Sequence, residues 1–287
     1  MPDSLRQTLR GLAAAAGAFF GKPVYEPKPA KAPVRIGLAL GSGFARGVTH
    51  VGVLRVLEKH KIPIHCISGV SAGAIVASAY ASGTSLDEIE RISRSMRFKD
   101  VAGWSISMLG LARNERMDRF LDRALRVKKF EEMPIRLAVV ATDVRSGAAT
   151  VFRDFGDVKE PVRASCCYPG LFQPVRYKGR LLVDGAVAMD IPAEPLLSLG
   201  ATHVISVSLP TPLEIDDPSN LLAVVNRCFQ ILQRRTEYEW RKHSALVLEP
   251  EVSKVGWDDF EKAGDMIAAG EAATEAAMPQ ILSWFKK

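Results

Sequence analysis

The chain has 287 residues, of which 47% are hydrophobic and 24% are charged, so it can bury a substantial core and is not a disordered protein. Its formal net charge of +6 favours an anionic partner such as a membrane surface. The sequence contains no long Lys/Arg run with interleaved aromatic residues and no zinc-finger spacing, so we expect no nucleic-acid partner.

The four cysteines show neither a metal-binding nor a disulfide pattern. They lack CxxC spacing, and two adjacent cysteines seldom bridge, so we expect reduced thiols and a cytoplasmic location. No apolar run approaches the ~20 residues that a membrane-spanning helix needs. The cysteines are Cys66, Cys166, Cys167 and Cys228.

Residues 1–21 predict an amphipathic helix. At about 100° per residue, its apolar side chains form one stripe with Arg6 and Arg10 on the flank. Such a basic helix can lie on an anionic bilayer, which would place the protein peripherally on the inner face of the membrane. A helix docked on the protein's own body is an equally good interpretation, and a cleaved signal ranks third. Residues 22–33 are rich in Pro and Lys and predict an extended linker. The stripe comprises Leu5, Leu9, Leu12, Ala16, Phe19 and Phe20.

Strand and helix signals alternate over residues 34–209. This alternation predicts a three-layer α/β/α fold, in which helices cover both faces of a mainly parallel central sheet. Residues 210–287 are mainly helical and predict a C-terminal layer packed on the same domain. The expected strands are 34–40, 64–68, 135–142, 150–152, 180–183 and 203–209, and the expected helices are 48–60, 72–82, 193–199 and a charged helical region over 86–130.

The stretch GSGFARG (41–47) lies between a predicted strand and a predicted helix, where glycine-rich nucleotide-binding loops occur. The dinucleotide fingerprint fails because Arg46 stands where the third glycine belongs and the next strand ends without a carboxylate. A P-loop fails too, because no Lys-Ser/Thr pair follows. A nucleotide is therefore a poor explanation of these glycines.

The next strand ends in Gly69-Val70-Ser71-Ala72-Gly73, which has the form G-x-S-x-G. Between a strand and a helix this pattern predicts a nucleophile elbow, because small residues let the chain turn sharply and project the serine hydroxyl. The helix N-terminus at Ser71 also stabilises developing negative charge. We expect Ser71 to be a catalytic nucleophile, with Gly69 and Gly73 forming the elbow.

A serine nucleophile needs a base, and no histidine is well placed for this role. His203 begins its predicted strand, which puts it at the opposite edge of a parallel sheet from Ser71. Asp184 ends its strand and is expected at the same edge as Ser71, and Asp143 is a second candidate at the end of another strand. A carboxylate can accept the serine proton directly. The sequence thus suggests a two-residue serine–aspartate centre.

Three motifs in this order, GSGFARG, GVSAG and DGA, resemble those of the patatin-like phospholipase family, and the tail resembles that of its bacterial members. The resemblance extends through residues 141–147 and 163–175 to residues 183–201, so it covers most of the region 34–209. It implies an α/β/α fold and a Ser–Asp dyad that hydrolyses acyl esters of lipids, with Ser71 as nucleophile and Asp184 as base. It also implies an oxyanion hole built from Ser42, Gly43, Phe44, Ala45 and Arg46, with Arg46 at the family's basic position.

One residue departs from the family pattern. Phe44 stands where the family usually carries glycine, and a bulky residue resists the positive φ angles that glycine supplies. Either the turn needs no such angle at Phe44, or the oxyanion hole is distorted. Phe44 is also expected to narrow the acyl pocket.

We therefore expect a serine acyl hydrolase of phospholipase A or lysophospholipase type, which acts on phospholipid or lysophospholipid through an acyl-enzyme. No metal and no cofactor are expected, because no ligand cluster appears. Two alternatives on the same fold stay open: an acyltransferase, and a catalytically silent adaptor for membrane or protein contacts. The apolar segment 98–111 (FKDVAGWSISMLGL) is either a buried helix under the sheet edge or a lid or acyl-chain surface.

Overall fold

A computed structural model describes residues 33–209, 217–256 and 258–286 of the chain. The helix predicted over residues 1–21 and nearly all of the linker predicted over residues 22–33 lie outside these described residues. Residues 34–287 form one compact unit that holds the central sheet and the C-terminal helices.

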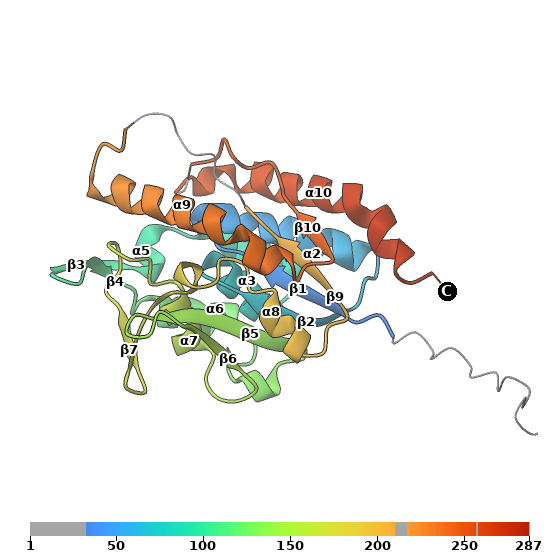
Figure 1. The fold of residues 1–287 in the computed structure, drawn as a ribbon, viewed down its shortest axis with the longest axis horizontal. Helices are drawn as coiled ribbons and strands as arrows, with labels where there is room; N and C mark the ends of the chain where they lie inside the picture. The colour runs from blue at the N-terminus through green and yellow to red at the C-terminus, as the bar shows by residue number, and fades with distance from the viewer. Residues whose placement is uncertain (1–32, 210–216, 257, 287) are drawn as a thin grey trace, which may run out of the picture. The chain divides into compact units, whose positions relative to one another are not determined.

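An eight-stranded sheet lies at the centre of this unit (Figure 1). Its strands are β1 (Ile36–Leu40), β2 (Ile64–Gly69), β5 (Arg136–Asp143), β6 (Ala149–Arg153), β7 (Val175–Tyr177), β8 (Arg180–Asp184), β9 (His203–Val207) and β10 (Leu246–Leu248). The strand order is β10-β9-β1-β2-β5-β8-β7, and β6 also pairs with β5. The first five strands in this order are parallel, whereas β6 and β8 run antiparallel to β5.

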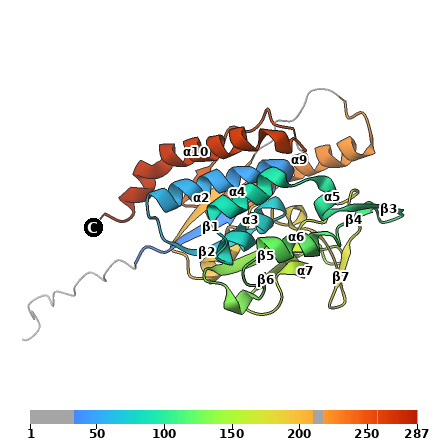
Figure 2. The same cartoon turned by 180° about the vertical axis from the view of Figure 1, so that it is seen from behind.

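Helices cover both faces of the sheet, which confirms the predicted three-layer α/β/α fold. Figure 1 shows two helices in front of the sheet, α8 (Glu194–Ser198) and α9 (Leu221–Arg241). Figure 2 shows the opposite face. The helices on that face are α2 (Thr49–Lys59), α3 (Ala72–Ala81), α4 (Leu86–Ser95), α6 (Met117–Ala124), α7 (Lys159–Ser165) and α10 (Ala263–Ser283).

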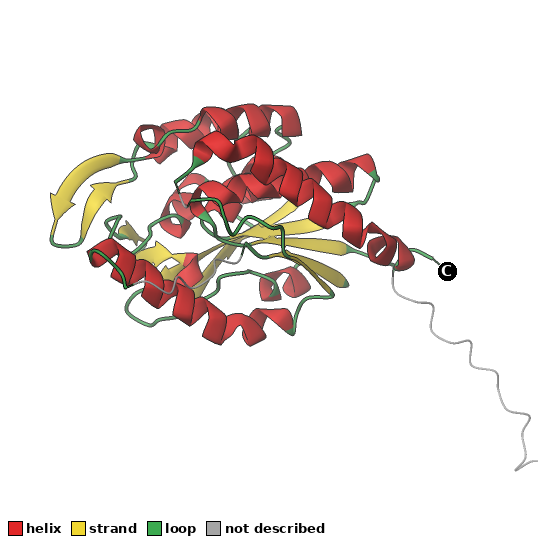
Figure 3. Ribbon diagram, turned by 90° about the horizontal axis from the view of Figure 1, so that it is seen from above, coloured by secondary structure: helices red, strands yellow, loops and turns green. Residues whose placement is uncertain are grey.

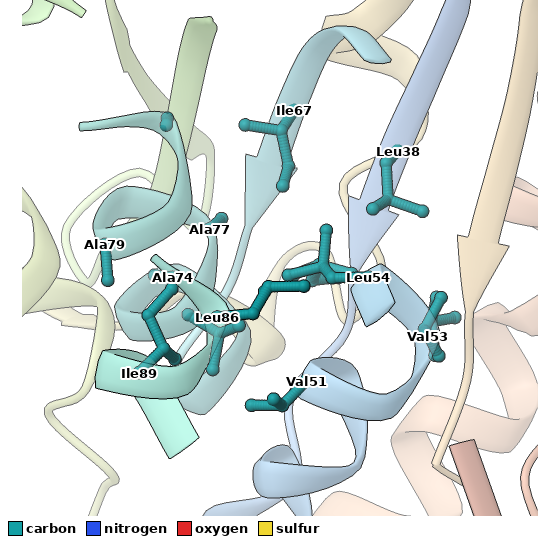
Figure 4. Packing of buried hydrophobic residues seen from close by; sticks show 14 of the residues in the cluster. Leu38, Val51, Val53, Leu54, Ile67, Ala74, Ala77, Ala79, Leu86 and Ile89 are labelled. Carbon is teal, nitrogen blue, oxygen red and sulfur yellow. The ribbon is translucent and has the colours of Figure 1, made fainter. Parts of the chain in front are cut away.

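Strand β1 is buried along its whole length and packs on both faces. Successive side chains of a strand point to opposite faces, so Leu38 and Ala39 belong to two different hydrophobic clusters. Leu38 shares its cluster with Leu54 of α2 and Ile67 of β2, as Figure 4 shows from close by. Ala39 shares the other cluster with Trp240 of α9. The central strands are therefore fixed from both sides, and their carboxyl ends form a rigid edge.

The predicted helical region over residues 86–130 is wrong in its middle. After α4 come a short helix, α5 (Phe98–Val101), and a hairpin of β3 (Gly103–Ser107) and β4 (Gly110–Arg113). Figure 3 shows this hairpin projecting from the body. The N–H groups of Leu111 and Ala112 donate to the carbonyl of Leu171, 60 and 59 residues away in sequence, and such a long-range pairing leaves no local signal. The interpretation of segment 98–111 as a buried helix is therefore wrong.

None of the helices within residues 33–209, 217–256 and 258–286 combines the length and the hydropathy needed to cross a bilayer.

Candidate active site

Ser71 occupies a strained turn between β2 and α3. Its backbone angles are φ 54° and ψ −124°, in a region that non-glycine residues rarely adopt. Two hydrogen bonds hold this turn: the Ser71 N–H donates to Oγ of Ser165 (2.9 Å), and the Ser165 hydroxyl donates to the Val140 carbonyl (2.6 Å). Backbone strain of this kind persists only where the surroundings fix it. The turn presents the Ser71 side chain at the N-terminus of α3.

The two glycines of the elbow have no room for a side chain. A Cβ on Gly69 would lie 2.4 Å from the carbonyl oxygen of Gly73, and one on Gly73 would lie 2.3 Å from the carbonyl oxygen of Leu40. The chain therefore turns here with helix α3 packed directly against the ends of β1 and β2. This contact requires glycine at both positions.

Strands β2 and β8 share one side of β5. On its other side, β5 pairs with β6 over residues 138–142. Since β2 pairs with residues 136–139 and β8 with residues 141–143, both must lie on the side that β6 leaves open. Strand β2 is parallel to β5 and β8 is antiparallel, so the two run toward each other and their carboxyl ends meet.

This register brings Asp184 to Ser71. Gly69 pairs with Val139, so Ser71, two residues further on, comes level with Ala141. Ala141 pairs with Asp184, the last residue of β8. The sequence predicts Asp184 at this edge as the end of a strand in a mainly parallel sheet, whereas β8 runs antiparallel to β5. The carboxylate arrives from the opposite direction.

Asp184 is a buried carboxylate, only 1% exposed, that contacts the serine. Burial raises its pKa to about 7; hydrogen bonds from the Ala186 N–H (2.9 Å) and from the Ser71 side chain oppose this rise, and the charge of Asp190 adds to it. Since desolvation disfavours the charged form, the carboxylate holds a proton more readily than an exposed aspartate. Ser71 and Asp184 thus lie side by side at the cavity, and the acid is poised near neutral pH.

The glycine-rich loop after β1 packs beside this pair. Phe44 has φ 50°, so of the two alternatives left by the sequence, the one in which the turn needs no left-handed angle at Phe44 does not hold. Its ring packs edge-on against Tyr168 with 4.9 Å between ring centroids. The Arg46 N–H donates to the Gly43 carbonyl (3.0 Å), and Ala45 is fully buried. The amides of Ala45 and Arg46 therefore sit inside the turn.

A buried histidine supports the loop from behind. His50 of α2 is fully buried, and burial lowers its pKa to about 4, so it is neutral at pH 7. Its Nε2 lies 2.9 Å from the Gly41 carbonyl, which can only accept, so this nitrogen carries the proton. The Gly41 N–H donates in turn to the carbonyl of Val207 in β9 (3.1 Å). His50 thus holds the loop in place and takes no part in the Ser71–Asp184 contact.

The pair opens into a cavity of about 370 Å³. The predicted site residues that line this cavity lie at or just after the ends of β1, β2 and β8. Residues of helix α9 line its other side. Ala45 is the one residue of the predicted oxyanion loop that does not reach the cavity. The lining includes Ser42, Gly43, Phe44, Arg46, Ser71 and Asp184.

The two rival candidates for a base do not reach this cavity. Asp143 accepts from the Arg145 N–H (3.0 Å) within the turn that follows β5. His203 pairs with Ile36, the first residue of β1, which lies at the opposite edge of the sheet from Ser71, as predicted. In the part of the chain that the structure describes, no group of three His, Cys, Asp or Glu side chains is arranged to hold a metal ion.

A comparison with known protein families identifies the chain. Residues 38–197, more than half of its length, match the family model of the patatin-like phospholipases. The chain belongs to the patatin-like phospholipase family. The resemblance carried by GSGFARG, GVSAG and DGA is thereby confirmed, and all three motifs fall at the cavity just described.

Curated relatives within this family include bacterial and fungal proteins. An uncharacterized NTE family protein of Mycobacterium bovis is 35% identical over 178 residues, which cover 61% of this chain and 49% of that protein. Lysophospholipase NTE1 of Debaryomyces hansenii is 31% identical over 182 residues, which cover 61% of this chain and 12% of that protein. This chain therefore spans about half, or less, of the length of these relatives. The crystal structure of VipD from Legionella pneumophila has a TM-score of 0.60 at 14% identity, over 87% of this chain and 67% of that one, which supports the α/β fold.

The patatin-like site contains a second carboxylate that our sequence reasoning missed. Asp190 accepts hydrogen bonds from the Ser42 hydroxyl (2.5 Å) and from Nε2 of Gln233 in α9 (2.7 Å), so it ties the glycine-rich loop to that helix. Burial of the Asp190 carboxylate raises its pKa to about 6. The hydrogen bonds from Ser42 and Gln233 and the positive charge of Arg46 oppose this rise. The only signal in the sequence is that Asp190 follows Asp184 by six residues in DGAVAMD.

Proposed function

We propose that this chain hydrolyses fatty-acyl esters of lipids, with Ser71 as nucleophile and Asp184 as general base. The observation that carries the proposal is the juxtaposition, in one cavity, of a serine on a strained elbow and a buried carboxylate whose pKa is raised to about 7. A general base works best when its pKa lies near the operating pH. Membership of the patatin-like phospholipase family supports the same assignment.

The proposed reaction has two halves. In the first, Asp184 takes the hydroxyl proton as Oγ of Ser71 attacks the ester carbonyl, and then gives that proton to the departing alcohol. In the second, water attacks the acyl-enzyme, Asp184 takes a proton from it, and the fatty acid leaves as Oγ recovers its hydrogen. Both halves pass through a tetrahedral oxyanion.

We assign the oxyanion hole to the main-chain N–H groups at the start of the glycine-rich loop. Gly43 and Phe44 line the cavity, whereas Ala45 is buried away from it. The N-terminus of α3 adds favourable potential at the same place. Loss of one oxyanion donor typically costs about 10²–10³ in rate.

The proposed substrate is a phospholipid or lysophospholipid presented by an anionic membrane, as a peripheral contact from the cytoplasmic side. A relative is named a lysophospholipase, and the net charge of +6 favours an anionic surface. Faster fatty-acid release from a diacyl phospholipid would indicate phospholipase A activity, and faster release from a lysophospholipid would indicate lysophospholipase activity. Water as acceptor makes the chain a hydrolase, whereas an added alcohol that captures the acyl group would make it a transferase.

The proposal is tested by fatty-acid release from p-nitrophenyl butyrate, from diacyl phosphatidylglycerol vesicles and from lysophospholipid micelles. We expect Ser71→Ala to abolish all three activities. Ser146→Ala is the matched control, because Ser146 is an exposed loop serine, and this variant should keep full activity. Full hydrolysis by Ser71→Ala would refute the assignment, and a protein inactive on every ester would favour the silent-adaptor alternative.

A further inference from the structure

The tip of the β3–β4 hairpin is apolar and exposed. The two residues that connect its strands are Met108 and Leu109, with exposed fractions of 104% and 60%. Tight hairpin turns ordinarily carry Asn, Asp or Gly, which suit the backbone and water alike. Two large apolar side chains at this position leave most of their surface in contact with water. Contact with an apolar environment outside the protein would therefore stabilise this tip.

An aromatic side chain continues this apolar surface toward the body. Trp104 of β3 is 71% exposed, and its ring lies 5.3 Å from that of Phe98. Phe98 in turn stacks on Phe172 at 6.0 Å. Tryptophan combines an apolar body with one polar N–H and favours the boundary between a membrane and water. The hairpin thus carries an apolar tip with an amphipathic ring behind it.

The hairpin is built onto the wall of the catalytic cavity. The N–H groups of Leu111 and Ala112 in β4 donate to the carbonyl of Leu171 (3.0 and 2.9 Å). Tyr168, three residues earlier in the same segment, lines the cavity and packs on Phe44. Figure 1 shows the hairpin at the end of the sheet to which β1 points. A surface docked at this tip would therefore lie on the side of the molecule where the cavity is.

Basic side chains surround the base of the hairpin. An open groove there is lined by four exposed cations and one acid. Arg116 ties the groove to the hairpin, because its guanidinium donates to the carbonyl of Ala102 (3.3 Å), next to the first residue of β3. Cations near a bilayer surface are attracted to anionic lipid phosphates. The groove residues are Lys99, Asp100, Arg116, Arg119 and Arg123.

We propose that Met108 and Leu109 insert into the interfacial region of a bilayer rich in anionic lipid, while the basic groove contacts its headgroups. This inference rests on the proposed lipid-hydrolase function, since it supplies the surface from which the substrate enters. The pattern of an apolar tip, an interfacial tryptophan and a basic border fits a bilayer. A protein partner is a poorer fit, because the apolar surface is small and has four positively charged side chains beside it. Charged residues are depleted at the centre of protein–protein interfaces.

The direct test places an environment-sensitive NBD fluorophore at the tip of the full chain. The labelled protein carries Met108→Cys in a Cys228→Ser background, because Cys228 is the exposed cysteine and the other three are buried. On vesicles of phosphatidylcholine with 30% phosphatidylglycerol (about one lipid in three) we expect a blue shift and strong quenching by brominated acyl chains. The control carries Phe155→Cys instead, since Phe155 is 81% exposed in the loop after β6, at the opposite edge of the sheet. The emission of a fluorophore at position 155 should stay at the wavelength that it shows in water.

A second pair of variants separates docking from catalysis. We expect Met108→Glu/Leu109→Glu to weaken vesicle binding at least about tenfold and to slow vesicle hydrolysis equally, with hydrolysis of soluble p-nitrophenyl butyrate unchanged. Phe155→Glu should alter none of these. Ser71→Ala should bind vesicles normally. Vesicle binding therefore tests the docking proposal even if Ser71 turns out not to be the nucleophile. Water-like emission at position 108 on vesicle-bound protein would overturn the proposal, as would a concentration-dependent dimer that the double variant abolishes.

Discussion

Ser71 and Asp184 meet because two strands that run in opposite directions end at the same point of β5. The register places both residues level with Ala141, one through parallel pairing and the other through antiparallel pairing. This placement of the proposed nucleophile and base needs no third residue to bridge the strands. The positions of the two side chains are set by backbone pairing deep in the sheet, and this gives the site its rigidity.

The raised pKa of Asp184 predicts an acidic limb in the pH profile, on which activity rises with pH. The base must be ionised, so kcat/KM should rise about tenfold per pH unit below pH 7 and level off above it. The slope is positive because only the carboxylate form accepts the Ser71 proton. A profile for p-nitrophenyl butyrate between pH 5 and 9 measures this midpoint. Rates independent of pH down to pH 5 would be incompatible with Asp184 as the base.

The same pKa predicts that Asp184→Asn stabilises the fold at alkaline pH. Burial raises the pKa of Asp184 to about 7 from its ordinary value of 3.8, so the folded protein binds this proton more tightly than the unfolded chain. Stability is therefore fully present below about pH 3.8 and is lost as the pH rises through about 7. Removing the charge should recover on the order of a few kcal/mol at pH 8 and much less at pH 5. Thermal melts of both proteins at the two pH values test this.

Asp190 is predicted to tune the base. Its charge is one cause of the raised pKa of Asp184, so Asp190→Asn should move the midpoint of the pH profile to lower pH. Asparagine keeps an acceptor for the Ser42 hydroxyl and Nε2 of Gln233, so the loop contacts survive. Asp143→Asn, which removes a carboxylate outside the cavity, should leave the midpoint unchanged. An unmoved midpoint in Asp190→Asn would show that the two carboxylates are not coupled.

The elbow is predicted to tolerate no side chain at Gly73. In Gly73→Ala the new Cβ would lie 2.3 Å from the Leu40 carbonyl oxygen, so α3 must move away from the strand ends. We expect a loss of about 1–3 kcal/mol in the free energy of unfolding and a larger loss of activity, since Ser71 shifts with the helix. The control is Gly264→Ala in α10, where the nearest atom is a guanidinium nitrogen at 3.5 Å. Unchanged melting and activity in Gly73→Ala would contradict the packing described here.

The fold was predictable from the sequence wherever local patterns carry it. The G-x-S-x-G motif at Ser71 and the strand–helix alternation follow from short-range steric rules, so these predictions needed no tertiary information. The direction of β8 does not follow from the sequence, because strand pairing is long-range, and Asp184 reaches Ser71 from an antiparallel strand. The hairpin that carries Met108 does not follow from the sequence for the same reason, because strand β4 is held by long-range hydrogen bonds to the Leu171 carbonyl.

Phe44 shows a different limit of sequence reasoning. Its departure from the glycine pattern was evident, but its left-handed angle is stabilised by packing on Tyr168, a residue 124 positions away. Asp190 escaped notice because an aspartate six residues after a motif carries no pattern of its own. Its role becomes visible only when Ser42 and Gln233, from distant elements, are seen on either side of it.

The central claim is that Asp184 activates Ser71, and labelling by a fluorophosphonate tests it most directly. Mass spectrometry of the labelled peptides should place the adduct on Ser71 alone, since only an activated serine attacks phosphorus readily. Labelling should slow by at least about 10² in Asp184→Asn and stay unchanged in Asp143→Asn, because general-base assistance typically contributes that much. An adduct on another serine such as Ser42, or equal labelling rates in Asp184→Asn and the unmodified protein, would contradict the account.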